Sequence, residues 1–287
     1  MAESKYRFLF ISAFCLPDDS PFRGPKRQEG VPKEQRLQNY ENIKHLLEDV
    51  EWDAHPGAIA TYGNWTVENR EEFLHAAFGR IPIVREACES SKYNAIILEG
   101  GGEPGFMEAR EITRQYGIPV TSCAHSQMHV ASMLGNKFAV IDFSDVHNMF
   151  YHNLVVQHRM TERCASIRNL GYYHAKPDYP GEPSFGAERE KAVAGERSEG
   201  VERAVAEAVD AIEEDGADVI MFGCSGAFWL KPFVEKRLHE MGWEVPVLEG
   251  YGCAIELAKV MVDMGVTASG LAFPSDRPKK RPRKIVF

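Results

Sequence analysis

The chain of 287 residues repeats part of its own pattern at about half its length, and this repeat constrains the fold more than any other feature. The matching segments are RFLFIS at 7–12 with KFAVID at 137–142, NAIILEGGG at 94–102 with DVIMFGCSG at 218–226, and IPV at 118–120 with VPV at 245–247. Because the order and approximate spacing of three segments are kept, the sequence predicts two similar halves.

Short runs rich in β-branched and aromatic residues alternate with amphipathic stretches along both halves. We expect strands at 7–12, 94–98, 118–122, 138–142, 164–167, 218–222 and 246–248. We expect helices at 35–50, 71–90, 107–116, 143–159, 201–214 and 254–264. Apolar strands that alternate with helices are typical of parallel sheets built from right-handed βαβ units. The predicted fold class is therefore α/β, with two pseudo-symmetric parallel-sheet domains.

The composition narrows the class of protein further. Hydrophobic residues make up 44% and charged residues 26% of the chain, with a net charge of −9, which is typical of a globular protein and excludes a disordered or fibrous one. No apolar run approaches the roughly 18 residues that a membrane span needs. Six cysteines without a CxxC pair indicate reduced thiols. We expect a cytoplasmic protein that binds neither nucleic acid nor membrane.

Two long loops and a basic tail interrupt the pattern. The segment 16–32 directly follows the first expected strand, and the segment 172–196 is rich in Gly, Pro and charged residues. Long loops at strand ends are where open α/β sheets bind ligands. The tail RPKKRPRK at 277–284 is expected to be solvated or to contact another subunit of a homo-oligomer.

Superposing the two halves places Gly100 opposite Cys224, each just past the end of a buried strand. Both lie in a glycine-containing turn that leads into the next helix, where backbone N–H groups favour an anion such as a carboxylate. A cysteine in this position is expected to have a lowered pKa and to act as a proton carrier or a nucleophile. Cys224 is therefore the main catalytic candidate.

Six segments together resemble the aspartate/glutamate/hydantoin racemase superfamily, and hydantoin racemases match them best. The segments are 94–105, 118–135, 138–144, 164–171, 217–226 and 245–265. The resemblance implies two α/β domains with the site in the cleft between them. It divides the chain into a first domain of residues 1–122 plus 247–287 and a second of 123–246. It also implies proton transfer without a cofactor, carried out by two cysteines on opposite faces of a carbon acid.

Cys224 stands where the family's second cysteine belongs, but Gly100 replaces the first. A single thiol delivers a proton to one face only, which suits the loss of CO₂ or another group followed by protonation. Arylmalonate decarboxylases of the same superfamily resemble this pattern, although they carry hydroxyl residues where this chain has Gly101 and Gly102. We therefore expect a lyase or decarboxylase-like reaction on a small carboxylate or cyclic amide.

Two alternatives remain open. A racemase or isomerase needs a second base, and Glu99, Glu103 or His125 is a candidate for this role. A relative that binds a ligand without catalysis is the other alternative.

Further residues are expected to bind the substrate, and no metal is expected. The candidate binding residues are Ser12, Gly100, Gly101, Gly102, Ser144, Ser225 and Gly226. His125 and His129 have the spacing of a metal-binding pair, but the remaining residues of an HExxH motif are missing.

Overall fold

The computed structural model describes residues 4–22, 31–177, 184–275, 280 and 282–284. These residues form two parallel four-stranded sheets, one in each half of the chain. The first sheet has the order β2-β1-β3-β4 and the second has the order β6-β5-β7-β8. β1, β3 and β4 thus occupy the same places as β5, β7 and β8, which are the three pairs of segments that match in the sequence. The predicted α/β class with two halves is confirmed.

The strands follow the apolar runs of the sequence closely. The first sheet consists of β1 (Tyr6–Ile11), β2 (Val50–His55), β3 (Ala95–Leu98) and β4 (Val120–Ser122). The second consists of β5 (Phe138–Asp142), β6 (Cys164–Asn169), β7 (Val219–Phe222) and β8 (Val247–Leu248). Every residue of β3, β5 and β7 is buried, as expected for central strands of a parallel sheet that is covered on both faces.

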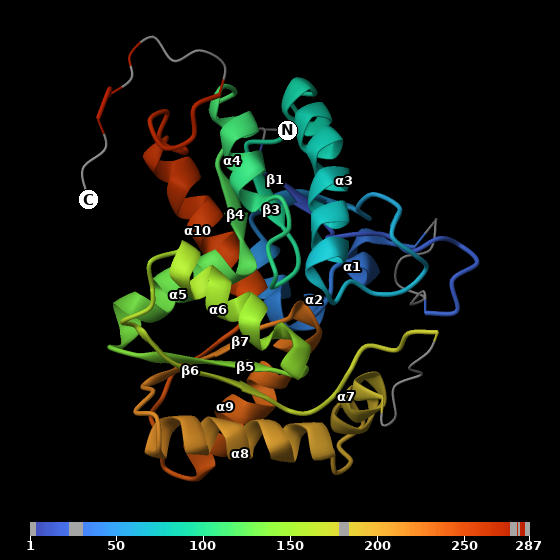
Figure 1. Ribbon diagram of the computed structural model, residues 1–287, viewed down its shortest axis with the longest axis vertical. Helices are drawn as coiled ribbons and strands as arrows, with labels where there is room; N and C mark the ends of the chain where they lie inside the picture. Colours follow the sequence, from blue (N-terminus) through green and yellow to red (C-terminus); the bar gives the residue numbers. More distant parts are fainter. Residues whose placement is uncertain (1–3, 23–30, 178–183, 276–279, 281, 285–287) are drawn as a thin grey trace.

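Helices cover the two sheets (Figure 1). Those before β5 are α1 (Lys33–Arg36), α2 (Tyr40–Ile43), the 3₁₀ helix η2 (Lys44–Leu47), α3 (Arg70–Glu89), α4 (Phe106–Arg114) and α5 (Cys123–Leu134). Those after β5 are η3 (Asp145–His147), α6 (Asn148–Gln157), α7 (Phe185–Val193), α8 (Glu199–Glu213), η4 (Ser225–Leu230), α9 (Lys231–Glu240) and α10 (Gly250–Met264). In Figure 1, α3 and α4 lie in the upper half with the first sheet, and α8 and α9 lie below the second sheet.

The last helix ties the two halves together. α10 leaves the second sheet after β8 and packs against β4 and β3 of the first half and against α5, which itself contacts strands of both sheets (Figure 1). α10 (residues 250–264) therefore returns to the first half. β8 itself pairs with β7, so residues 247 and 248 lie in the second sheet and not in the first.

Two local predictions were wrong. The segment 35–50 is not one helix but α1, α2 and η2, and it is followed by the unpredicted strand β2. β2 is an edge strand, and its exposed charged residues hide the pattern of a buried strand. The insertion 172–196 also contains a helix, α7, whose first turn is capped by the side chain of Ser184.

Parts of three predicted features lie outside the described residues. They are residues 23–30 of the 16–32 loop, residues 178–183 of the insertion, and residues 277–279 and 281 of the basic tail. Among the helices that the structure describes, none is both long and apolar enough to cross a membrane.

Candidate active site

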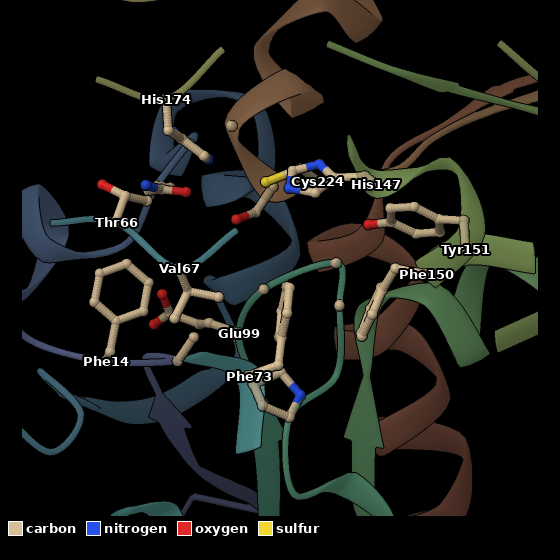
Figure 2. A pocket seen from close by; sticks show the side chains of 18 of the residues that line it. Phe14, Thr66, Val67, Phe73, Glu99, His147, Phe150, Tyr151, His174 and Cys224 are labelled. Carbon is tan, nitrogen blue, oxygen red and sulfur yellow. The ribbon is translucent and has the colours of Figure 1, made fainter. Parts of the chain in front are cut away.

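A cavity lies between the two halves, at the carboxyl ends of the central strands (Figure 2). The first half contributes Ala13, Phe14, Gln38, Thr66, Val67, Phe73, Glu99, Gly100, Gly101, Gly102 and Pro104 to its wall. The second half contributes His147, Phe150, Tyr151, His174, Cys224, Ser225 and Gly226, and Tyr251 comes from α10. Because parallel strands of both sheets end here, side chains distant in sequence meet around one space.

Cys224 lies one residue beyond Gly223, which directly follows β7, and it immediately precedes η4. The carboxylate of Asp142, the last residue of β5, accepts a hydrogen bond from the Cys224 backbone N–H at 2.9 Å. The sulfur faces the cavity in Figure 2. The neighbouring strand thus holds the cysteine in position through its backbone and leaves the thiol directed at the cavity.

The structure contradicts the expectation that Cys224 has a lowered pKa. Burial, and then the charge of Asp142, raises the pKa of the thiol to about 12. Hydrogen bonds from the Gly226 backbone and the Ser225 side chain act in the opposite direction but are weaker. The following helix is a 3₁₀ helix of only 6 residues, so it cannot offset the loss of water as a long α-helix would. In the resting protein Cys224 is a neutral thiol, which is a proton donor.

Glu99 lies at the end of β3 and brings a carboxylate to the cavity from the first half (Figure 2). Its side chain is buried, and Oε2 accepts a hydrogen bond from the Ser12 hydroxyl at 3.0 Å. Arg80, which is also buried, donates hydrogen bonds to the backbone carbonyls of Glu99 and Ile11. The ends of β1 and β3 are therefore joined through Arg80, and the Ser12 hydroxyl holds the Glu99 carboxylate in place.

Close packing explains why three glycines follow Glu99. Gly100 has a φ of +95°, which favours glycine. A Cβ on Gly101 would overlap the carbonyl oxygen of Gly223, and a Cβ on Gly102 would overlap the ring of Phe73. This turn can therefore approach the second half closely only without side chains. The binding of an anion by its backbone N–H groups stays a prediction.

Glu103 and His125 do not line the cavity, so the structure gives neither of them access to a substrate there. Glu103 Oε1 accepts hydrogen bonds from the His125 backbone N–H at 2.5 Å and from the Ser122 hydroxyl, and Oε2 lies 2.7 Å from Nε2 of His158. Glu103 thus holds the start of α5. The His125 ring packs against Phe106, with ring centroids 5.0 Å apart, and burial lowers its pKa to about 2.

The hydroxyl residues proposed for substrate binding fall into two groups. Ser225 lies in the cavity wall with Gly226. Ser12 and Ser144 are buried outside it, and Ser12 acts through its hydrogen bond to Glu99. The structure therefore supports contact with a substrate for Ser225 only.

Several residues of the wall were not predicted from the sequence, and His147 is the most important of them. The sequence left open whether His147 makes a surface or intersubunit contact or takes part in the chemistry. In the structure His147 is only 2% exposed and lines the cavity. Its Nδ1 lies 3.2 Å from Oδ1 of Asp142. Asp142 matches Ser12 in the repeat, and this acidic residue at the end of a buried strand is a signal that could have led to His147.

The wall is mostly apolar and carries few charges. Aromatic rings come from Phe14, Phe73, Phe150, Tyr151 and Tyr251, and no Lys or Arg is among the described lining residues. Within the described part of the chain, no group of three or more His, Cys, Asp or Glu is placed to hold a metal ion.

Comparisons with known proteins agree with this architecture. A family model described as Asp/Glu/Hydantoin racemase matches residues 40–258. A hydantoin racemase from a Pseudomonas species is 30% identical over 185 residues, which cover 64% of this chain and 64% of that protein. The chain thus matches less than two thirds of the length of that relative.

Two solved structures share the fold. An allantoin racemase from Klebsiella pneumoniae superposes with a TM-score of 0.66 at 18% identity, covering 95% of this chain and 94% of that one. A variant of arylmalonate decarboxylase superposes with a TM-score of 0.54 at 14% identity, covering 92% and 96%. The family model spans well over half of the sequence. The matching strand orders of the two sheets and the cavity between the halves are consistent with this family match. The chain belongs to the Asp/Glu/hydantoin racemase family.

Proposed function

We propose that this protein is a racemase that inverts a carbon next to a carbonyl group, with Cys224 and Glu99 as the two groups that exchange protons with it. The observation that carries the proposal is that the segments following β3 and β7 each bring one titratable side chain to the same cavity. Cys224 comes from the loop after β7 and Glu99 from the end of β3, which are equivalent strands of the two sheets. Glu99 thereby replaces the thiol that is missing at Gly100.

The reaction needs only two proton transfers. The Glu99 carboxylate removes the proton from one face of the carbon, and the bonding electrons move into the adjacent carbonyl to give an enolate. The Cys224 thiol then delivers its proton to the opposite face, and the carbonyl re-forms. The protein is left with a thiolate and a carboxylic acid, which the reverse reaction or exchange with water restores to the starting state.

The charge of the wall favours an uncharged substrate. A dicarboxylate would find no Lys or Arg among the described lining residues, and it would face the Glu99 carboxylate. A cyclic diamide of the hydantoin type offers N–H and C=O groups to polar side chains and an apolar substituent to the aromatic rings. The name of the Pseudomonas relative supports this class of substrate and favours racemisation over the lyase reaction that we expected from the sequence.

The test is solvent isotope exchange in D₂O with one enantiomer of 5-benzylhydantoin. We expect racemisation with deuterium at the chiral carbon, measured by chiral chromatography and NMR. Both Cys224→Ser and Glu99→Gln are expected to lose at least about 100-fold in rate. Cys164→Ser and the exposed Glu108→Gln serve as matched controls because neither residue lines the cavity.

Other outcomes would point to the alternatives. If Glu99→Gln retains the wild-type rate, the role of Glu99 as the second base is wrong. Release of CO₂ from phenylmalonate by the wild type, without any racemisation, would restore the lyase hypothesis that the glycine at position 100 suggests. Binding of 5-benzylhydantoin without exchange would indicate a relative that only binds its ligand.

A further inference from the structure

Asp142 connects the catalytic cysteine to a buried histidine. One carboxylate oxygen accepts the Cys224 backbone N–H at 2.9 Å, and the other lies 3.2 Å from Nδ1 of His147. Oδ1 also accepts the backbone N–H of Phe143 at 2.6 Å, so the carboxylate is fixed. Because a carboxylate accepts hydrogen bonds, Nδ1 of His147 carries a proton. The orientation of the imidazole is therefore set by the same group that positions Cys224.

The other ring nitrogen of His147, Nε2, makes no hydrogen bond to the part of the chain that the structure describes. Nε2 is buried, and the side chain as a whole is 2% exposed. His147 lines the cavity together with Cys224 (Figure 2). Burying a polar nitrogen without a partner is costly, so such atoms in folded proteins call for an explanation. A ligand in the cavity would supply the missing partner.

We propose that His147 is a catalytic residue whose Nε2–H donates a hydrogen bond to the substrate carbonyl oxygen next to the reacting carbon. The proposal rests on the proposed racemase function, because only an enolate places growing negative charge on that oxygen. A donor held in advance in a cavity stabilises such a charge more than it stabilises the neutral substrate. Asp142 acts through His147 and is a positioning residue.

The charges around the ring agree with a protonated Nε2. Burial alone lowers the pKa of His147, but the charge of Asp142 and its hydrogen bond raise it above the usual value, with smaller contributions from Glu68 and Asp145. The other histidine of the wall, His174, stays neutral because burial lowers its pKa to about 3. His147 is thus the histidine of the wall that is suited to act as a charged donor.

The test compares His147→Gln with His152→Gln, an exposed histidine on α6 that serves as the matched control. With 5-benzylhydantoin, we expect His147→Gln to lower kcat about 100-fold while KM changes by less than about 3-fold. His152→Gln is expected to behave as the wild type. Circular dichroism and thermal melting show whether each variant is folded. A His147→Gln variant that is folded and keeps kcat within about 3-fold of the wild type overturns the proposal.

A second measurement does not depend on turnover. The ligand 5,5-dimethylhydantoin has no hydrogen on its substituted carbon, so it cannot be racemised. In wild-type protein with ¹⁵N-labelled histidine, this ligand should shift the Nε2 resonance of His147. That resonance is assigned as the one missing from the spectrum of His147→Gln. If His147→Gln does not fold, the resonance is assigned as the one displaced in Asp142→Asn. No shift at saturation would contradict contact between Nε2 and the ligand.

The two measurements separate this inference from the proposed function. If the wild type racemises the substrate and His147→Gln does so at the same rate, the proposed role of His147 is wrong and the racemase function is retained. If the Nε2 resonance shifts but the wild type shows no racemisation, the proposed racemase function is wrong. His147 then only binds the ligand, which also contradicts its catalytic role. Loss of both signals would overturn both.

Discussion

Gly101 of the first half packs directly against the carbonyl group of Gly223 of the second half, so closely that a methyl group on Gly101 would overlap the oxygen. The same methyl group would overlap the hydroxyl of Tyr151. These two glycines belong to the loops that carry Glu99 and Cys224. The distance across the proposed site is therefore set by backbone contact between the halves.

Substituting Gly101 with Ala is expected to push the two loops apart. Forcing a methyl group against a backbone carbonyl costs about 1–3 kcal/mol of the free energy of unfolding, and the racemisation rate should fall at least about 10-fold. Urea unfolding and chiral chromatography measure the two effects. Gly186→Ala is the control, since a Cβ there meets only ordinary van der Waals contact, 3.4 Å from the hydroxyl oxygen of Ser184. If Gly101→Ala and Gly186→Ala have the same free energy of unfolding and the same racemisation rate, the close packing at Gly101 is contradicted.

The Cys224 thiol is expected to react slowly with iodoacetamide at pH 7. Burial and Asp142 raise its pKa to about 12, so only a minute fraction is thiolate at neutral pH. The alkylation rate should rise about tenfold per pH unit between pH 7 and 10, because the thiolate is the reactive form. Peptide mass spectrometry follows the modification, with Cys224→Ser as the blank. A fast rate that does not change with pH would indicate a thiolate, as we first expected from the sequence.

Phe73 and Phe150 belong to the apolar wall of the cavity and face each other across the two halves. Their rings stack at a centroid distance of 4.2 Å, one from α3 and the other from α6. In Phe150→Ala, we expect the preference in kcat/KM for 5-benzylhydantoin over 5-methylhydantoin to fall about 10-fold, because an apolar contact with the benzyl ring is lost. Phe78→Ala is the control, since this side chain is 76% exposed on the same α3. An unchanged preference would place the benzyl group elsewhere.

Lys176 links the insertion to the first half through two ion pairs. Its Nζ lies 3.1 Å from Glu72 and 3.3 Å from Glu68. Lys176→Met should destabilise the fold by about 1–2 kcal/mol because the buried Glu72 carboxylate loses a cationic partner, and it should raise KM. Lys236→Met, whose ion pair with Glu240 is exposed, should change neither quantity. If both variants have the same stability and KM, the insertion does not hold the halves together through this contact.

Glu249 is expected to make stability depend on pH. Burial raises the pKa of its carboxyl group from 4.5 to about 7, although the backbone N–H groups of Gly252 and Tyr251 lower it. Because the folded state holds this proton more tightly than the unfolded state, the contribution is complete below pH 4.5 and is lost as the pH rises through 7. The loss amounts to at most about 3 kcal/mol.

Urea unfolding between pH 4.5 and 8 measures this dependence. The Glu249→Gln variant should show a flatter profile than the wild type over that range, and the exposed Glu244→Gln should follow the wild type. A Glu249→Gln profile with the wild-type slope would show that another group is responsible.

Most of the fold could be predicted from local patterns. The central strands are apolar at nearly every position, and the two halves repeat the same order of strand, loop and helix, so class and symmetry follow without knowledge of distant contacts. The equivalence of Gly100 and Cys224 comes from the same alignment of halves. β2 was missed because the strand predictions rest on uninterrupted apolar runs, whereas VEWDAH alternates apolar and polar residues, as a half-exposed edge strand does.

The candidate site was predicted only in part, because a role in a cavity depends on where a side chain points. Glu99 and Glu103 are four residues apart in one loop and looked equivalent, but β3 directs Glu99 to the cavity, whereas the left-handed backbone at Glu103 accompanies a turn toward α5. His125 follows a strand end as Cys224 does, yet its ring packs behind the wall, against Phe106. The spacing of residues along the sequence does not show in which direction these side chains point.

The sequence by itself determined the α/β class, the paired halves and the place of Cys224 at a strand end, since these depend on hydrophobic periodicity and on repeated order along the chain. Only the tertiary structure decided the protonation of Cys224 and the partners of His147. Both depend on Asp142, which is 82 residues from Cys224 in the chain and 2.9 Å from its backbone nitrogen in the fold. Electrostatic and desolvation effects act through space, so the order of residues alone does not reveal them.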